Sequence, residues 1–180
     1  MSENLKTSRY RNGGLITNVT DNTAWGNLTT ETIGAWSYYN NDETNNAIYG
    51  KLYNWYTTLG DTLCPSGWGV PSDAEWTTLT DSLGGESVAG GKMKSIGTAY
   101  WNNPNIDATN ERGFSALPGG YRSDYVGGFY AVRDRAVFWS ATEDDNSLAW
   151  GRYLSSNFGD VDRFSYGNKT FGASVRCLRD

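Results

Sequence analysis

Two thiols are the most reactive side chains in this chain. Cys64 and Cys177 stand in a sequence without histidine, so the commonest general base and the commonest transition-metal ligand are both missing. Two cysteines alone cannot build a structural zinc site. They either form one disulfide that closes a long loop or remain as two buried free thiols. Catalysis that relies on a histidine base or a histidine-bound metal is therefore excluded for this sequence.

The acidic stretch "EDDN" at 143–146 is a second candidate for chemistry. Clustered carboxylates beside a side-chain amide suit a hard cation, so a structural calcium ion is one interpretation. A solvated acidic turn is the other interpretation, and the one that we favour. Apart from that calcium alternative, the sequence predicts no cofactor.

The stretch "AWGRYL" at 149–154 alternates as a β-strand does, with residues two apart on one face. The inward set is expected to be Trp150, Arg152 and Leu154, and the outward set Gly151, Tyr153 and Ser155. A buried Arg152 needs a carboxylate or carbonyl partner, and the alternative is a place at the sheet edge, paired with an acidic residue. Further on, Phe158, Phe164 and Tyr166 stand among Ser, Gly and Asp. Rings beside small adaptable groups are typical of an exposed binding surface.

Composition limits the class of protein. The 180 residues fit one domain, 1–180, that is long enough to bury a core. A net charge of −5 argues against nucleic acid as a partner. No stretch approaches the roughly 20 apolar residues of a membrane span, and the N-terminus lacks a basic-then-apolar signal segment. We expect a location at the cell surface, outside the cell or in a virion, with no membrane insertion by this chain.

The clearest element is a helix that begins with the capping box of Ser72 and Glu75 and ends before Gly84. Its apolar face is expected to comprise Trp76, Leu79 and Leu83. Two further helices are expected over 45–59 and 87–95. Their buried residues are expected to be Ile48, Leu52, Trp55, Tyr56 and Leu59 in the first, and Val88, Met93 and Ile96 in the second.

Short strands are expected mainly in the second half of the chain. The candidates are "GAWSYYN", "FSAL", "GGFYAV", "AVFWSAT", "AWGRYL", "VDRFSY" and "GASVRCL". Two or three helices followed by crowded strands indicate an α+β domain with a short, twisted antiparallel sheet.

Motifs along nearly the whole chain resemble one family. They are "ENLKTSRY", "NVTDNTAW", "YGKLYNWY", "LCPSGWGVPSDAEWTTL", "AGGKMK", "GFSALPGGYR", "FWSAT" and "SVRCLRD". In this order they resemble the Fibrobacter succinogenes major paralogous domain. The resemblance implies a C-type-lectin-like fold, related to that of formylglycine-generating enzymes. Similar proteins occur on bacterial surfaces and in gut phages, and several are variable products of diversity-generating retroelements.

That resemblance implies a variable C-terminal region at about 144–173. Adenine-directed mutagenesis of AAY codons cannot produce Lys, Glu, Gln, Met or Trp, and none of these occurs at the positions expected to vary. Those seventeen positions are Asp144, Asp145, Ser147, Leu148, Gly151, Tyr153, Ser155, Ser156, Phe158, Gly159, Asp160, Asp162, Phe164, Ser165, Tyr166, Gly167 and Thr170. Ala173 stands where the family usually has Phe, which leaves the end of the region open.

The expected function is recognition of a protein or another cell-surface ligand by these side chains. One alternative is an undiversified structural or adhesive domain of a bacterial surface protein. The other is an enzyme of the formylglycine-generating type. Cys64 and Cys177 do not match the active-site cysteine arrangement of that enzyme family, so we expect no enzymatic activity.

Overall fold

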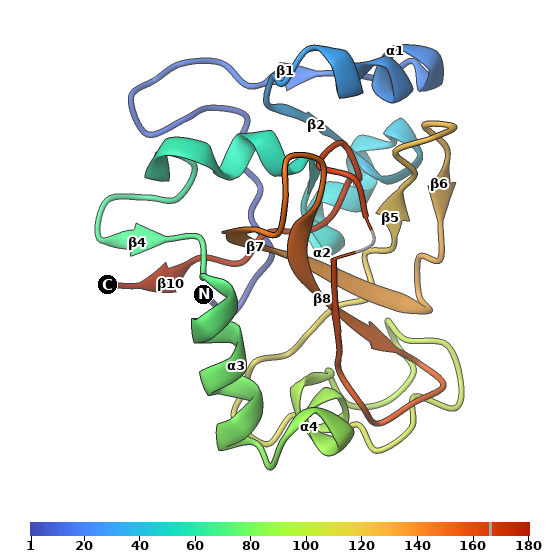
Figure 1. Ribbon diagram of the computed structural model, residues 1–180. Helices are drawn as coiled ribbons and strands as arrows, with labels where there is room; N and C mark the ends of the chain where they lie inside the picture. Colours follow the sequence, from blue (N-terminus) through green and yellow to red (C-terminus); the bar gives the residue numbers. More distant parts are fainter. Residues whose placement is uncertain (166) are drawn as a thin grey trace.

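The computed structural model describes residues 1–165 and 167–180, and it has a mixed α+β fold (Figure 1). The α-helices are α1 (Asn22–Asn27), α2 (Asn46–Tyr49), α3 (Asp73–Ser82) and α4 (Glu86–Met93). Short 3-10 segments cover Leu28–Thr30, Tyr39–Asn41, Glu43–Asn45 and Trp55–Asp61. The strands are β1 (Thr17–Asn18), β2 (Ala35–Ser37), β3 (Leu52–Tyr53), β4 (Trp68–Gly69), β5 (Tyr121–Arg122), β6 (Phe129–Tyr130), β7 (Arg135–Glu143), β8 (Ala149–Ser155), β9 (Asp162–Phe164) and β10 (Leu178–Arg179). Within the described ranges, no helix has the length and apolar character needed to span a bilayer.

The strands form several small sheets, where the sequence predicts one. The longest strands make the antiparallel sheet β7–β8–β9, which lies at the centre of the molecule (Figure 1). The others are β1–β2–β3, in which β1 and β2 are parallel, and the pairs β4–β10 and β5–β6. Two-residue strands such as these depend on packing around them for their stability.

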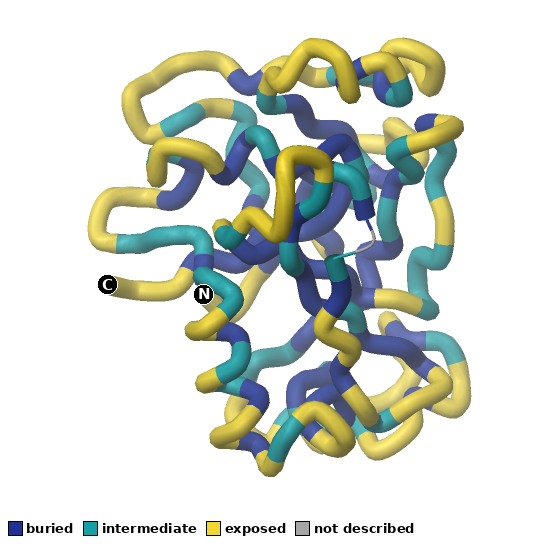
Figure 2. The backbone as a smooth tube through the Cα atoms, viewed as in Figure 1, coloured by how far each residue is buried: buried dark blue, intermediate teal, exposed yellow. Residues whose placement is uncertain are grey.

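The central sheet is buried on both faces. On one face, Val137, Trp139 and Phe164 belong to a core cluster that also contains the first-half residues Trp36 and Tyr53. On the other face, the sheet packs against α3 and α4 through a second cluster. That cluster includes Phe138, Leu154, Val161, Trp76 and Met93. Figure 2 shows buried backbone through the middle of the molecule, where β7 and β8 lie.

Helix α3 confirms the predicted capping box. Ser72 Oγ accepts a hydrogen bond from the Glu75 N–H, and Glu75 Oε2 accepts one from the Ser72 N–H at 2.7 Å. Trp76 and Leu83 are buried at 2% and 1% exposure. Gly84, with φ +103°, follows the helix in a conformation that favours glycine.

The helix predicted over 45–59 is wrong. Helix α2 ends after one turn at Gly50, whose φ is +73°. The chain then becomes β3, where the Tyr53 N–H donates to the Ala173 carbonyl at 2.8 Å. Two residues of the supposed apolar face, Ile48 and Leu59, are exposed. Main-chain pairing with distant segments therefore overrides the helical periodicity here.

The helix predicted over 87–95 is present as α4, and Met93 is fully buried as expected. Val88 and Ile96, predicted to be buried, are exposed instead. The strand predicted at "FSAL" is also wrong, because Ala116 makes only an isolated bridge with Lys94. This bridge still fixes the end of α4 to the loop that follows it.

The first and last parts of the chain are joined. The Leu5 N–H donates to the Val175 carbonyl at 2.8 Å. Cys64 and Cys177 form a buried disulfide with a Cα–Cα distance of 5.9 Å and a sequence separation of 113 residues. A crosslink over so long a loop restricts the unfolded chain and so stabilises the folded one.

Candidate functional site

The central sheet divides the predicted site residues by face. Gly151 pairs with Phe164, and Tyr153 with Asp162, so these four residues share one face. Arg152 pairs with Arg163 on the opposite face, which packs against α3. The inward and outward residues of β8 therefore alternate between the two faces as predicted.

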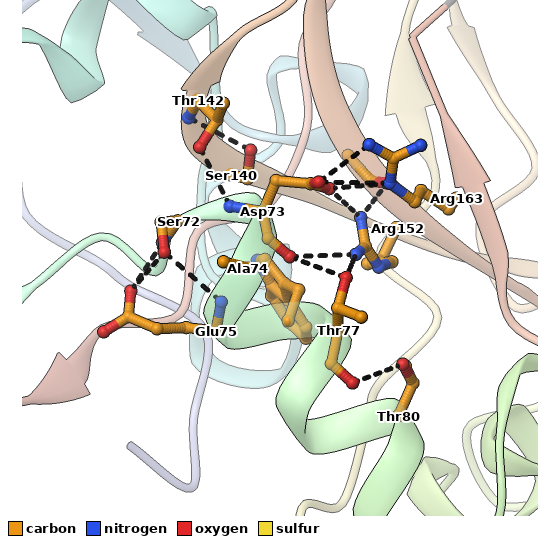
Figure 3. Close-up of polar contacts among 12 residues, drawn as sticks. Ser72, Asp73, Ala74, Glu75, Thr77, Thr80, Ser140, Thr142, Arg152 and Arg163 are labelled. Atoms are coloured by element: carbon orange, nitrogen blue, oxygen red, sulfur yellow. Dashed lines mark hydrogen bonds and ion pairs between the residues drawn. The ribbon is translucent and has the colours of Figure 1, made fainter.

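On the face that packs against α3, Asp73 forms ion pairs with two arginines, Arg152 and Arg163. The fully buried Arg152 donates to Asp73 Oδ1 at 2.7 Å and to Thr77 Oγ1 at 3.0 Å (Figure 3). Arg163 donates to Asp73 Oδ2 at 2.8 Å. Burial would raise the pKa of Asp73, but hydrogen bonds from Arg163 and Arg152 outweigh it and lower the pKa. Arg152 thus has the carboxylate partner that its place in the strand requires.

Trp150 corrects one expectation about this face. It is half-buried, although its set is predicted to point into the core. The Arg163 guanidinium lies over its ring, 3.4 Å from the centroid. Trp150 therefore lies half-exposed near the start of β8, under a cation that Asp73 also holds.

The other face is covered over much of its area, which corrects the exposure expected for several predicted positions. Phe164 is only 3% exposed, and a Cβ added to Gly151 would lie 2.5 Å from Phe164 Cζ. The reason is that the chain after β9 folds back over this face. Phe171 from this returning segment packs edge-on against both Phe164 and Trp139.

The seventeen predicted positions consequently differ in exposure. Those that are exposed are Asp144, Asp145, Ser147, Phe158, Asp160 and Asp162. Those that are half-buried are Leu148, Tyr153, Gly159 and Ser165. Those that are buried, against expectation, are Gly151, Ser155, Ser156, Phe164, Gly167 and Thr170. Tyr166 lies outside the described residues.

A small cavity opens on the covered face, and we call it the aromatic pocket. Its volume is about 100 Å³, and its lining residues are Tyr121, Arg135, Val137, Tyr153, Phe164, Gly167 and Phe171. Tyr121 stacks on Phe171 and Tyr130, with centroid distances of 4.9 and 5.7 Å. The Arg135 guanidinium lies 4.9 Å from the centroid of the Tyr153 ring.

Sequence reasoning missed four residues of this pocket: Tyr121, Arg135, Val137 and Phe171. Within the glycine-rich motif "GFSALPGGYR", Tyr121 is interpreted from sequence as a core residue. The alternation of Arg135, Val137 and Trp139 could have placed these three on one face of β7. The strand register, which places Val137 opposite Tyr153, shows that this face of β7 lies beside the predicted variable residues.

The turn between β7 and β8 carries four of the predicted positions. Asp145 Oδ1 accepts hydrogen bonds from the N–H groups of Ser147 and Leu148, and these bonds lower the pKa of Asp145. Lys169 Nζ pairs with Glu143 and donates to the Asp145 carbonyl at 2.7 Å. These contacts are those of a hydrogen-bonded acidic turn. Across the described part of the chain, no three Asp, Glu or Cys side chains are grouped to hold a metal ion.

The turn between β8 and β9 carries Phe158, Gly159 and Asp160. Lys94 is fully buried beneath it and donates to the carbonyl oxygens of Ser155 and Phe158, both at 2.8 Å. A third bond, of 2.7 Å, goes to the Ile106 carbonyl. Burial lowers the pKa of Lys94 to about 8, although Asp107 and Asp160 act against this shift.

The two turns lie at opposite ends of β8. A strand of seven residues spans about 20 Å, so the exposed positions form two surfaces and not one. The segment after β9 returns toward the first turn, where Leu148 bridges Asn168. The structure thus brings 144–148 beside 168–169 and leaves 158–160 near α4, as Figure 1 shows.

Comparison with known proteins gives one match. No curated protein and no solved structure matches the chain. The model of the Fibrobacter succinogenes major domain matches residues 1–179. Because the match covers all but the last residue, the chain belongs to the Fibrobacter succinogenes major domain family, as its motifs predict.

Proposed function

We propose that this chain is a ligand-recognition protein whose exposed C-terminal side chains are diversified by a retroelement. The scaffold in this proposal is a C-type-lectin-like domain, as the family motifs imply. The α+β architecture, with its joined chain ends and central three-stranded sheet, is consistent with such a scaffold. Recognition, and not chemical turnover, is the activity proposed.

One observation carries the proposal: buried cations hold the two exposed turns by their main chain. Lys94 bonds the carbonyls of Ser155 and Phe158, and Lys169 bonds the carbonyl of Asp145. All three of these acceptor residues belong to the set expected to vary. Because every residue type has a carbonyl, these bonds survive a change of side chain. A loop fixed in this way can present many side-chain sets in one conformation.

The positions that we propose to vary are the exposed and half-buried ones. They supply carboxylates, hydroxyls and rings, the mixture that adaptable binding surfaces use. Gly151 is unsuited, because any side chain there would overlap Phe164. A protein or another cell-surface molecule is the partner that we propose, and the acidic net charge speaks against nucleic acid.

The two alternatives differ from this proposal in what they require. An undiversified adhesive domain would have the same fold but no programmed variation. An enzyme of the formylglycine-generating type would need reactive cysteines, whereas Cys64 and Cys177 are bonded to each other and buried. These two residues therefore give the enzymatic alternative no support.

The gene's own neighbourhood tests the proposal. We expect a reverse-transcriptase gene and a near-identical copy of the DNA that encodes about 144–173. Mismatches between copy and gene should fall at adenines of the copy, in codons for the exposed and half-buried positions. The absence of such a copy, or mismatches spread equally over the codons for Arg152 and Leu154, would favour the undiversified adhesive domain.

A further inference from the structure

The aromatic pocket continues outward as a row of rings. Tyr130 on β6 is exposed, Tyr121 stacks between Tyr130 and Phe171, and Phe171 contacts the buried Phe164. The row therefore leads from solvent into the core on the face of β7–β8–β9 that the predicted variable set shares. An apolar group entering here would meet ring faces at each step.

Arg135 supplies a cation at the mouth of this pocket. Its side chain is exposed, and within the described residues its guanidinium forms no ion pair and no hydrogen bond. The arginines on the opposite face of the sheet differ in this respect, because Arg152 and Arg163 both bond to Asp73. Arg135 thus keeps its donors for an external acceptor, next to the ring of Tyr153.

The size and lining of the pocket limit its occupant. About 100 Å³ is well below the roughly 300–1,000 Å³ of sites for drug-sized molecules. It is room for one side chain. Among the residues that the structure describes, the lining contains no carboxylate and no amide side chain, so it offers few partners for the hydroxyl groups of a sugar. An apolar group with one negative charge fits this lining better than a glycan does.

We propose that the pocket receives one aromatic or branched apolar side chain of a protein partner, while Arg135 binds a carboxylate beside it. This inference rests on the proposed recognition function and adds the chemistry of the ligand. Tyr153 contributes from the variable set, whereas Arg135 and Tyr121 lie outside it. The pocket is then an anchor with mostly constant walls, in which Tyr153 is a wall that can change with the variable set.

A fragment titration followed by amide and ring NMR shifts tests the inference. The probes are 3-phenylpropionate, its neutral amide and glucuronate, each added to the full chain. We expect 3-phenylpropionate to shift Tyr153, Phe171 and Tyr121 saturably, with a dissociation constant on the order of millimolar. The amide and the variant Arg135→Gln should each weaken binding about fivefold, because one charge-assisted contact is lost.

Matched controls keep the outcomes separate. Arg112→Gln removes another exposed arginine, outside the pocket, and should leave the titration unchanged. Arg135→Lys retains the charge without the planar fork and should bind with intermediate strength. Unchanged melting temperatures of the variants would show that they are folded.

Three results would overturn the inference: no saturable shifts at the pocket, equal binding by wild type and Arg135→Gln, or preferred binding of glucuronate. The last would assign the pocket to an acidic sugar. If these titrations fail while the gene copy described above is found, the recognition function stands and only the ligand chemistry is wrong. A missing gene copy with positive titrations would leave an undiversified binding pocket.

Discussion

The ammonium group of Lys94 lies 2.8 Å from the carbonyl oxygen of Phe158, in a turn where the side chains of Phe158 and Asp160 face solvent. Phe158 is 59% exposed, whereas Lys94 is fully buried. The contact therefore joins a fixed interior group to the main chain of a residue whose side chain is free to differ. Such contacts explain how a fold with many loops and little regular structure holds its turns in place.

Replacing Lys94 tests this role. Lys94→Met removes three hydrogen bonds to main-chain carbonyls while keeping most of the side-chain volume. We expect the free energy of unfolding to fall by about 2–4 kcal/mol in urea titrations. Amide hydrogen exchange should become faster over 155–160. Lys92→Met, in the last turn of the preceding helix α4, removes only the partly exposed pair with Glu111 and should cost less than about 1 kcal/mol. Equal losses in the two variants would contradict the role given to Lys94.

Asp73 is expected to be the acid on which the central sheet depends most. Asp73→Asn leaves the buried Arg152 without a carboxylate, which typically costs about 3–5 kcal/mol. The control is Asp81→Asn, on an exposed position of the same helix, with an expected change within about 0.5 kcal/mol. Chemical unfolding of both variants gives the comparison. If Asp73→Asn left the free energy of unfolding unchanged, the other hydrogen-bond partners of the Arg152 guanidinium would be sufficient for it.

The same carboxylate predicts a dependence of stability on pH. Hydrogen bonds from Arg163 and Arg152 outweigh burial and hold the pKa of folded Asp73 below its usual 3.8. Its contribution is therefore fully present above pH 3.8 and is lost as the pH falls through the lower, folded pKa. Guanidinium unfolding between about pH 2 and 6 should show this loss in wild type and not in Asp73→Asn. If the free energy of unfolding of Asp73→Asn fell with pH as steeply as that of wild type, Asp73 would not be the source of the pH dependence.

Two glycines of the predicted variable set should respond differently to a methyl group. At Gly151 an added Cβ would lie 2.5 Å from Phe164 Cζ and 2.9 Å from the Phe138 carbonyl oxygen. Gly151→Ala should therefore cost about 1–3 kcal/mol. At Gly167 the nearest atoms lie at 3.5 Å, an ordinary contact, so Gly167→Ala should change stability by about 0.5 kcal/mol or less. Thermal unfolding of the pair measures the difference, and equal tolerance would show that the Phe164 ring moves aside.

Sequence alone predicts the parts of this molecule that depend on local signals. Ser72 and Glu75 identify the start of α3, because a capping box is complete within four residues. The strand period identifies which residues share a face with Gly151, and the burial cost of a guanidinium predicts a partner for Arg152. The family motifs identify the family to which the chain belongs.

What sequence does not predict depends on distant segments. Phe164 is buried because Phe171, on the segment that returns over the sheet, covers it. Leu52 is in a strand, and not in a long helix, because β3 pairs with β2. The aromatic pocket needs residues from β5, β7, β8 and β9 at once, so no local pattern reveals it.

A substitution scan of 140–175, read out by protease resistance of displayed variants, tests the central claim most directly. We predict that most substitutions at the exposed Asp144, Ser147, Phe158 and Asp160 leave the fold resistant. Substitutions at four buried residues should abolish protease resistance: Arg152, Leu154, Phe164 and Lys169. Phe164→Ala should lower the free energy of unfolding by about 3–5 kcal/mol, and Phe158→Ala by less than about 0.5 kcal/mol. Equal sensitivity of Phe158 and Phe164, or collapse on changing the exposed turn residues, would contradict a fold that is independent of its recognition side chains.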